Sequence, residues 1–160
     1  MSKTLIIQGS ARNDGNTATA ARQLEEATGG KLLDLLDHRI APYDYANKYP
    51  PNDQFLSLAR RIIIYDRLVL ASPVYWYSMS GPMKNFLDRF TDLITFHKDL
   101  GLRLRGKELA VLSCSGEKTV NAGFYEPFRL TAEYLGMEYG PEWHAFVRGS
   151  RIDVTERPRG

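Results

Sequence analysis

Short apolar runs alternate with amphipathic segments along the chain, and this alternation limits its fold more than any other feature. Runs such as Leu5–Ile7 and 67–75 hold consecutive aliphatic residues, which suit strands covered on both faces of a sheet. Between the runs, apolar residues recur at the spacing of a core-facing helix surface. This order predicts an α/β fold with parallel strands joined by right-handed helical crossovers. The predicted strands are 5–8, 31–36, 67–75, 108–115 and 142–147, and the predicted helices are 17–28, 53–65, 82–93 and 122–135.

The length of 160 residues fits a single domain that spans 1–160, without a linker or an internal repeat. A net charge of +2 is too small to indicate a nucleic-acid surface. Cys114 is the single cysteine, so an internal disulfide is impossible and a reducing compartment is expected. The sequence lacks the apolar run of roughly 18 residues that marks a membrane-spanning helix. We therefore expect a cytoplasmic protein whose partners are neither nucleic acid nor membrane.

The segment QGSARNDGNT, residues 8–17, follows the first predicted strand and has the composition of an anion-binding loop. Gly9 and Gly15 permit tight turns, and the N–H groups that start the next helix face the loop with the positive end of the helix dipole. Arg12 adds a charge that can bind phosphate oxygens. The alternative is that the polar residues only cap the helix and that Arg12 is a solvated surface charge. The side chains available to an anion are those of Ser10, Arg12, Asn16 and Thr17.

A second segment, SPVYWYSMSG, follows the third predicted strand. Parallel strands end at one edge of a sheet, and ligands bind outside that edge where the strand order reverses. Tyr75, Trp76 and Tyr77 therefore provide a flat, partly apolar wall near the anion-binding loop. Because side chains alternate along an extended segment, we expect one of the three to point inward. Together the two loops indicate a ligand with a phosphate tail and a flat ring.

The motifs GSARNDGNT and SPVYWYSMSGPMKNFLDR resemble the flavodoxin-like NAD(P)H-dependent FMN reductases, and the resemblance extends from Leu5 to Val147. It implies a flavodoxin-like three-layer sandwich with a five-stranded parallel sheet in the order 2-1-3-4-5. It also implies FMN as the cofactor, bound by three loops. The implied contacts are Ser10, Arg12, Asn16 and Thr17 for the phosphate, Pro73, Val74, Tyr75, Trp76 and Tyr77 for the ring, and Ser115 and Gly116 in the third loop.

The same resemblance implies an activity. Proteins of this family pass hydride from NADPH or NADH through bound FMN to a small acceptor, such as a quinone, a flavin, an azo or a nitro compound. Since the cofactor carries this chemistry, we expect neither a catalytic acid or base nor a metal ligand among the side chains. The tail from residue 148 is too short and polar for the helix that normally covers part of the sheet. We expect a homodimer or a different packing of the tail to cover that surface.

Two other functions stay open for a chain that binds FMN, namely a flavodoxin-type electron carrier and a non-catalytic regulatory module. Electron carriers of this type are usually strongly acidic, whereas this chain has 21 basic and 19 acidic residues. A phosphatase with Cys114 as nucleophile would need an arginine at position 120, where the chain has valine. Cys114 is therefore expected to pack as a small apolar residue at a strand end.

Residues 38–53 form a predicted loop with three prolines and three tyrosines. One interpretation is that its tyrosines cover the open face of the flavin ring and influence the choice of acceptor. The other is an ordinary surface loop that its prolines stiffen.

Overall fold

The computed structural model describes residues 2–158, which form a six-stranded sheet in the order β2-β1-β3-β4-β5-β6. Neighbouring strands run parallel, except that β6 is antiparallel to β5. The strands are β1 (Thr4–Gln8), β2 (Lys31–Asp34), β3 (Arg67–Pro73), β4 (Glu108–Ser115), β5 (Glu138–Arg148) and β6 (Arg151–Glu156). The helices are α1 (Asn16–Thr28), α2 (Phe55–Ile62), α3 (Gly81–Asp88), α4 (Lys98–Leu102) and α5 (Glu126–Leu135), with 3-10 helices η1 (Leu35–Asp37), η2 (Arg89–Leu93) and η3 (Ala122–Phe124).

The tail does not form a helix but adds a strand to the sheet. β6 turns back along β5 and pairs with it from Trp143 opposite Glu156 to Arg148 opposite Arg151. The α/β class and the order 2-1-3-4-5 are thus confirmed, while the expected count of five strands is one too low. The physical reason is that the backbone of β5 offers an edge to which a short polar segment can pair.

Helix boundaries differ from the prediction where local chemistry interrupts the periodic pattern. The segment predicted as helix 122–135 is divided into η3 and α5, because Pro127 occupies the first turn of α5 and lacks a backbone N–H. The helix predicted at 82–93 ends at Asp88 and continues as η2. α4 was not predicted from the sequence, because a helix of five residues is too short to show apolar residues recurring at helical spacing.

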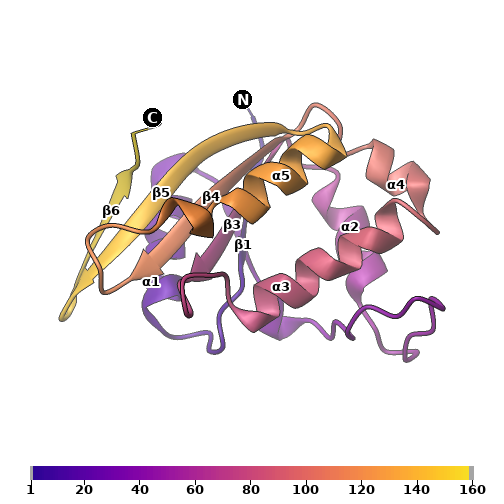
Figure 1. Ribbon diagram of the computed structural model, residues 1–160, viewed down its shortest axis with the longest axis horizontal. Coiled ribbons are helices and arrows are strands. Elements are labelled where there is room, and N and C mark those ends of the chain that lie inside the picture. Colours follow the sequence, from indigo (N-terminus) through magenta and orange to yellow (C-terminus); the bar gives the residue numbers. More distant parts are fainter. Residues whose placement is uncertain (1, 159–160) are drawn as a thin grey trace.

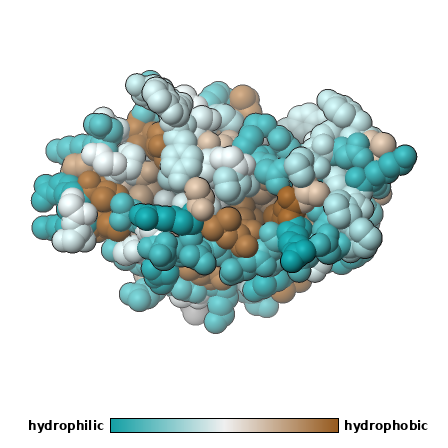
Figure 2. All heavy atoms as spheres, turned by 90° about the horizontal axis from the view of Figure 1, so that it is seen from below, coloured by the Kyte–Doolittle hydropathy of each residue, from teal (hydrophilic) through white to brown (hydrophobic). Residues whose placement is uncertain are grey.

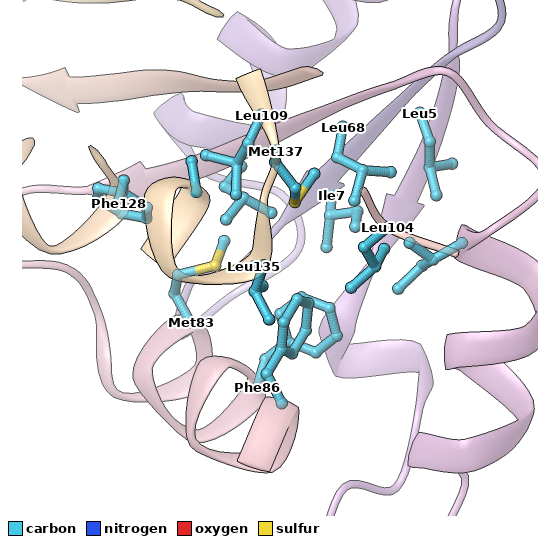
Figure 3. Packing of buried hydrophobic residues seen from close by; sticks show 14 of the residues in the cluster. Leu5, Ile7, Leu68, Met83, Phe86, Leu104, Leu109, Phe128, Leu135 and Met137 are labelled. Atoms are coloured by element: carbon cyan, nitrogen blue, oxygen red, sulfur yellow. The ribbon is translucent and has the colours of Figure 1, made fainter. Parts of the chain in front are cut away.

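Helices cover both faces of the sheet, but unequally (Figure 1). On one face, α2–α5 pack over the larger apolar cluster, which includes Leu5 and Leu68 of the sheet and Met83 and Phe86 of α3 (Figure 3). On the other face, α1 is the only helix within residues 2–158, and its Ala20 belongs to the smaller cluster. The apolar side chains of β5 and β6 that pack against this cluster are only partly buried, and they are Trp143, Val147, Ile152 and Val154.

No helix within residues 2–158 is both long and apolar enough to cross a membrane. The surface seen in Figure 2 is mixed, with hydrophobic areas interrupted by hydrophilic residues.

Candidate functional site

Two adjoining hollows open at the carboxyl edge of the parallel strands, where the loops after β1, β3 and β4 meet. The first has a volume of about 350 Å³, the second a volume of about 300 Å³, and they share Val74 and Ser115. The first hollow is lined by Ser10, Arg12, Gly15, Asn16, Thr17, Pro73, Val74, Tyr75, Cys114, Ser115, Gly116 and Val147. The second hollow is lined by Val74, Trp76, Tyr77, Ser115, Glu117, Thr119, Val120 and Asn121.

All the residues predicted to contact a ligand therefore line one hollow or the other. Trp76 and Tyr77 line only the second hollow, and the other predicted residues line the first. The sequence did not predict Gly15, Cys114 and Val147 as contacts in the first hollow, nor the four residues after Gly116 that line the second hollow. For Val147, the signal available was its place at the carboxyl end of the fifth predicted strand. The polar run GEKTVN was a similar signal for the loop.

The start of α1 is arranged to receive an anion in the first hollow. Gly15 is the N-cap residue and has no side chain, so no side chain caps the first N–H groups of the helix. Ser10 and Thr17 are buried at 5% and 4% exposure, yet they line the hollow. The arrangement combines free N–H groups, two hydroxyls and the positive end of a helix dipole.

Arg12 is exposed, but its side chain lies across Gly15. A Cβ atom built on Gly15 would be 2.7 Å from Arg12 Nε, which is closer than any real contact allows. Glycine at position 15 therefore makes room for the arginine beside the helix start. In this position the arginine side chain lines the first hollow.

Two serines fix the base of the loop after β3. The Ser80 N–H donates to Ser72 Oγ at 2.9 Å, and the Ser80 hydroxyl donates to the Gly9 carbonyl at 2.6 Å. Gly9 is needed here because an added Cβ would lie 3.0 Å from Met83 of α3. The first and second loops are thus held together by a buried hydrogen bond between the Ser80 hydroxyl and the Gly9 carbonyl.

The aromatic segment forms a two-residue turn. Tyr75 and Ser78 exchange backbone hydrogen bonds of 2.8 and 3.1 Å, and Trp76 and Tyr77 between them have φ angles of 49° and 67°. Tyr75, Trp76 and Tyr77 are 42%, 93% and 73% exposed. The expectation that one of them points inward is wrong, because the segment is a turn rather than an extended strand. Such angles are unfavourable for residues other than glycine.

Cys114 lies at the end of β4 and lines the first hollow. It packs with the smaller apolar cluster, as expected for a small strand-end residue. Burial raises the pKa of its thiol, and the nearby Thr17 hydroxyl opposes this rise without cancelling it. The thiol therefore stays protonated at neutral pH, which argues against a nucleophilic role.

The tyrosine-rich loop 38–53 lies away from both hollows. Arg89, 2% exposed, donates to the Asp53 carboxylate at 2.8 and 3.0 Å and to Asp92 at 2.9 Å. Tyr49 donates to Asp92 at 3.0 Å and its ring stacks on the Arg89 guanidinium. No residue of the loop lines either hollow. Within one chain this agrees with a surface loop and not with a cover over the aromatic turn.

Comparison with known proteins gives the same picture. A family model described as NADPH-dependent FMN reductase matches residues 2–147. The chain is similar to the uncharacterized NAD(P)H oxidoreductase YdeQ of Bacillus subtilis (strain 168), at 30% identity, covering 76% of this chain and 68% of the relative.

Two solved structures have a similar fold. The Trp repressor binding protein from Bacillus subtilis matches with a TM-score of 0.71 and 21% identity, over 91% of this chain and 87% of that one. The general stress protein 14 of Treponema denticola, solved in complex with FMN, matches with a TM-score of 0.60 and 22% identity, over 89% and 84% of the two chains. At these identities the two structures support the fold alone.

Proposed function

Because this chain belongs to the NADPH-dependent FMN reductase family, with FMN as cofactor and NAD(P)H as reductant, we propose that the two adjoining hollows are its flavin site. The phosphate of FMN would occupy the first hollow, beside Arg12 and the N-terminus of α1. The flavin ring would lie along the shared wall at Val74 and extend toward Trp76 in the second hollow. The proposed contacts are the residues predicted from sequence, joined by Gly15 and by the loop after Ser115.

One observation carries this proposal. The first hollow is polar and has a helix start without a side-chain cap, whereas the second is walled by exposed aromatic residues. The two hollows also adjoin. A ligand that fits both needs an anionic end and a planar, partly apolar end, which describes FMN.

FMN, when bound, supplies the centre that accepts hydride from the nicotinamide and passes electrons to the acceptor. The protein's own residues have three tasks. Arg12 and the α1 amides hold the phosphate, the loop at Val74 fixes the ring, and the exposed turn at Trp76 leaves room for a second planar molecule. We propose that a small planar acceptor, such as a quinone, an azo or a nitro compound, binds there after the nicotinamide has left.

A flavodoxin-type electron carrier is the second candidate, since it would use the same cofactor site. The nearly balanced charge favours the reductase, because a carrier gains docking speed from a strong field of one sign. The open space beside the aromatic turn also suits a small molecule that must stack and leave.

Two further points of the proposal concern the molecule as a whole. We propose a cytoplasmic location, where the single buried thiol of Cys114 stays reduced. We also propose a homodimer in which a second copy covers the half-buried face around Val147 and Ile152.

The test is an absorbance spectrum of the purified protein after incubation with FMN and desalting, followed by anaerobic titration with NADPH and with NADH. Retained flavin that bleaches within seconds supports the reductase. Retained flavin that stays oxidised favours the carrier or a regulatory module. If no flavin survives desalting and none is detected in a binding titration, the assignment of the hollows is wrong.

A further inference from the structure

A buried hydrogen-bonded group lies beneath the loop after β4, outside the lining of both hollows. Ser113, Tyr125 and His144 are 0%, 2% and 3% exposed. The Ser113 hydroxyl lies 2.5 Å from the Tyr125 hydroxyl and 2.8 Å from His144 Nδ1. On the opposite side of its ring, His144 Nε2 lies 2.7 Å from the carbonyl oxygen of Glu117. The group thus connects the interior of the sheet to the loop that walls the second hollow.

The donors and acceptors in this group follow from its chemistry. A carbonyl oxygen can only accept, so His144 Nε2 carries the hydrogen and donates it to Glu117. In a neutral ring Nδ1 is then the acceptor, and the Ser113 hydroxyl donates to it. Tyr125 completes the chain by donating to Ser113 Oγ. Each hydroxyl and each ring nitrogen has a partner, which fixes the orientation of the imidazole.

The bond to His144 has a direct effect on the loop. In a trans peptide the C=O and the following N–H point in opposite directions, so a Glu117 carbonyl turned toward the buried ring directs the Lys118 N–H away from it. Among the described residues, the N–H groups of Lys118 and Thr119 have no hydrogen-bond acceptor. Glu117 and Thr119, on either side of Lys118, both line the second hollow.

We propose that His144 is a positioning residue of the flavin site: by holding the Glu117 carbonyl inward, it presents the loop amides at Lys118 and Thr119 to the polar edge of the flavin ring. The identification of the ring rests on the proposed function. An N–H directed at that edge stabilises the negative charge that the ring gains on reduction, in the same way as an oxyanion hole.

The C-terminal tail contributes to the same group. The Arg157 guanidinium lies 4.0 Å from the centre of the Tyr125 ring, forms an ion pair with Glu142 of β5, and its backbone N–H donates to the Glu142 carbonyl at 2.7 Å. Arg157 directly follows β6, so the end of this strand contacts Tyr125, which donates the first hydrogen bond of the buried group. This position ties the tail to the loop through Tyr125, Ser113 and His144.

Two substitutions of His144 separate its two hydrogen bonds. The amide of His144→Gln reaches about as far as Nε2 and keeps a donor for Glu117. The shorter His144→Asn keeps a polar group near Ser113 but loses that donor. His38→Asn is the matched control, because His38 also bonds a backbone carbonyl, Asp34 O at 3.0 Å, and lines neither hollow.

The first readout needs no flavin. Backbone 15N order parameters of the FMN-free protein at 117–120 are expected to fall from about 0.85, the value of rigid backbone, to below about 0.6 in His144→Asn, and to change little in His144→Gln and in the control. The second readout is FMN affinity, for which we expect a loss of about tenfold in His144→Asn alone, together with a shift of the visible flavin bands. Thermal unfolding monitors whether each variant is folded.

The proposal is overturned if folded His144→Asn keeps the order parameters and the FMN affinity of the wild-type protein. It is also overturned if Asn and Gln weaken FMN binding equally, since His144 would then act only through core packing. Should His144→Asn fail to fold, Ser113→Ala, which leaves Nδ1 without its donor, is expected to lower the order parameters at 117–120 by a smaller amount, and no fall would overturn the proposal. Absence of FMN binding by the wild-type chain would instead refute the proposed function, while the order parameters would still decide whether His144 restrains the loop.

Discussion

Arg12 and Gly15 act as one unit at the start of α1. The glycine leaves the helix without a side-chain cap, and its missing Cβ gives the arginine side chain a place to lie. The missing Cβ of Gly15 therefore leaves space for the Arg12 side chain at the rim of the first hollow. Substitutions of Arg12 and of Gly15 test this arrangement separately.

Arg12→Ala is expected to weaken FMN binding by about 1.5–3 kcal/mol, the range for a hydrogen bond to a charged group. The cause is the loss of the bond from the guanidinium to the phosphate. Titration of the FMN-free protein with FMN, followed by flavin fluorescence, measures the change. Arg103→Ala, which removes an exposed arginine distant from both hollows, is the control and should leave the affinity unchanged. Wild-type affinity in Arg12→Ala would refute the phosphate role.

Gly15→Ala is expected to lower FMN affinity by about as much as Arg12→Ala, because the new Cβ displaces the arginine. The free energy of unfolding should fall by no more than about 1 kcal/mol, because alanine is a poorer N-cap residue than glycine while the clashing atom belongs to a flexible side chain. The double variant should lose no more than either single one, because both remove the same interaction. Gly81→Ala, whose Cβ would meet no atom within 4 Å, is the control. Additive losses would show that Gly15 has a separate role.

At the scale of elements, the turn at 75–78 holds two aromatic residues in a backbone conformation that favours glycine. Trp76 and Tyr77 both have positive φ angles, and the hydrogen bonds between Tyr75 and Ser78 maintain them. Strain of this kind persists where the surrounding structure and the function require it. The turn places both rings in solvent beside the second hollow.

Tyr77→Gly is expected to stabilise the FMN-free protein by about 1 kcal/mol, because glycine adopts this φ without the penalty paid by other residues. The same substitution should lower kcat/KM for a quinone acceptor, because part of the aromatic wall is removed. Urea unfolding and steady-state kinetics give the two values. Tyr134→Gly, at an exposed tyrosine inside α5, should have the opposite sign and destabilise by about 1 kcal/mol. A less stable Tyr77→Gly would mean that the turn is not strained.

The buried ion cluster at Arg89 connects loop 38–53 to the region after α3. Burial raises the pKa of Asp53, but the hydrogen bonds from Arg89 and from the Ala41 N–H outweigh it, and the net pKa is lowered. A carboxyl group whose pKa is lowered by folding stabilises the protein at pH values above its ordinary pKa. This contribution is lost as the pH falls through the pKa that the group has in the folded state. Wild-type stability should therefore decrease in acid below about pH 4.

Arg89→Met is expected to destabilise the protein by about 3–5 kcal/mol at pH 7, because it leaves two buried carboxylates unpaired. Between pH 7 and pH 4 the variant should become more stable, as those carboxylates protonate, whereas the wild-type protein should not. Urea unfolding at several pH values measures both slopes. Lys84→Met, which breaks an exposed ion pair with Asp88, should cost less than about 1 kcal/mol at any of these pH values.

At the scale of the whole molecule, the unequal covering of the sheet bears on its assembly. Within residues 2–158, α1 is the only helix on its face, and the apolar residues of β5 and β6 that pack against the same cluster are half-buried. β6 lengthens the sheet at its edge but adds no layer above it. Part of one sheet face thus remains available to a second copy of the chain.

Sedimentation velocity at micromolar concentrations is expected to show a dimer. Ile152→Lys should shift the population toward monomer, because it places a charge on the face that the dimer would bury. Thr155→Lys, at an exposed position of β6, is the matched control and should sediment like the wild-type protein. A wild-type monomer over this concentration range would contradict the dimer.

The sequence alone determined the elements whose signals are local. Consecutive aliphatic residues at Leu5–Ile7 and in 67–75 marked buried parallel strands, and the helical spacing between them determined the α/β class, while the order of the strands was implied by the resemblance to the FMN reductases. The same order brought the loops at Ser10, Val74 and Ser115 to one edge, because parallel strands end there together. The class of the fold and the meeting of the loops needed only periodicity and the rules of strand connection.

Only the tertiary structure decided features that depend on contacts distant in sequence. β6 forms because its backbone pairs with the edge of β5. The sequence of this short polar segment does not indicate that such an edge is available to it. The turn at Trp76 has no Gly or Asn to reveal it, since its angles are imposed by a framework that includes the bond from Ser80 to Gly9. His144 likewise gains its partners from β4 and from the loop at Glu117, so spacing alone could not show its role. Local propensity is encoded residue by residue, whereas these features arise from the packing of segments that meet only in the folded chain.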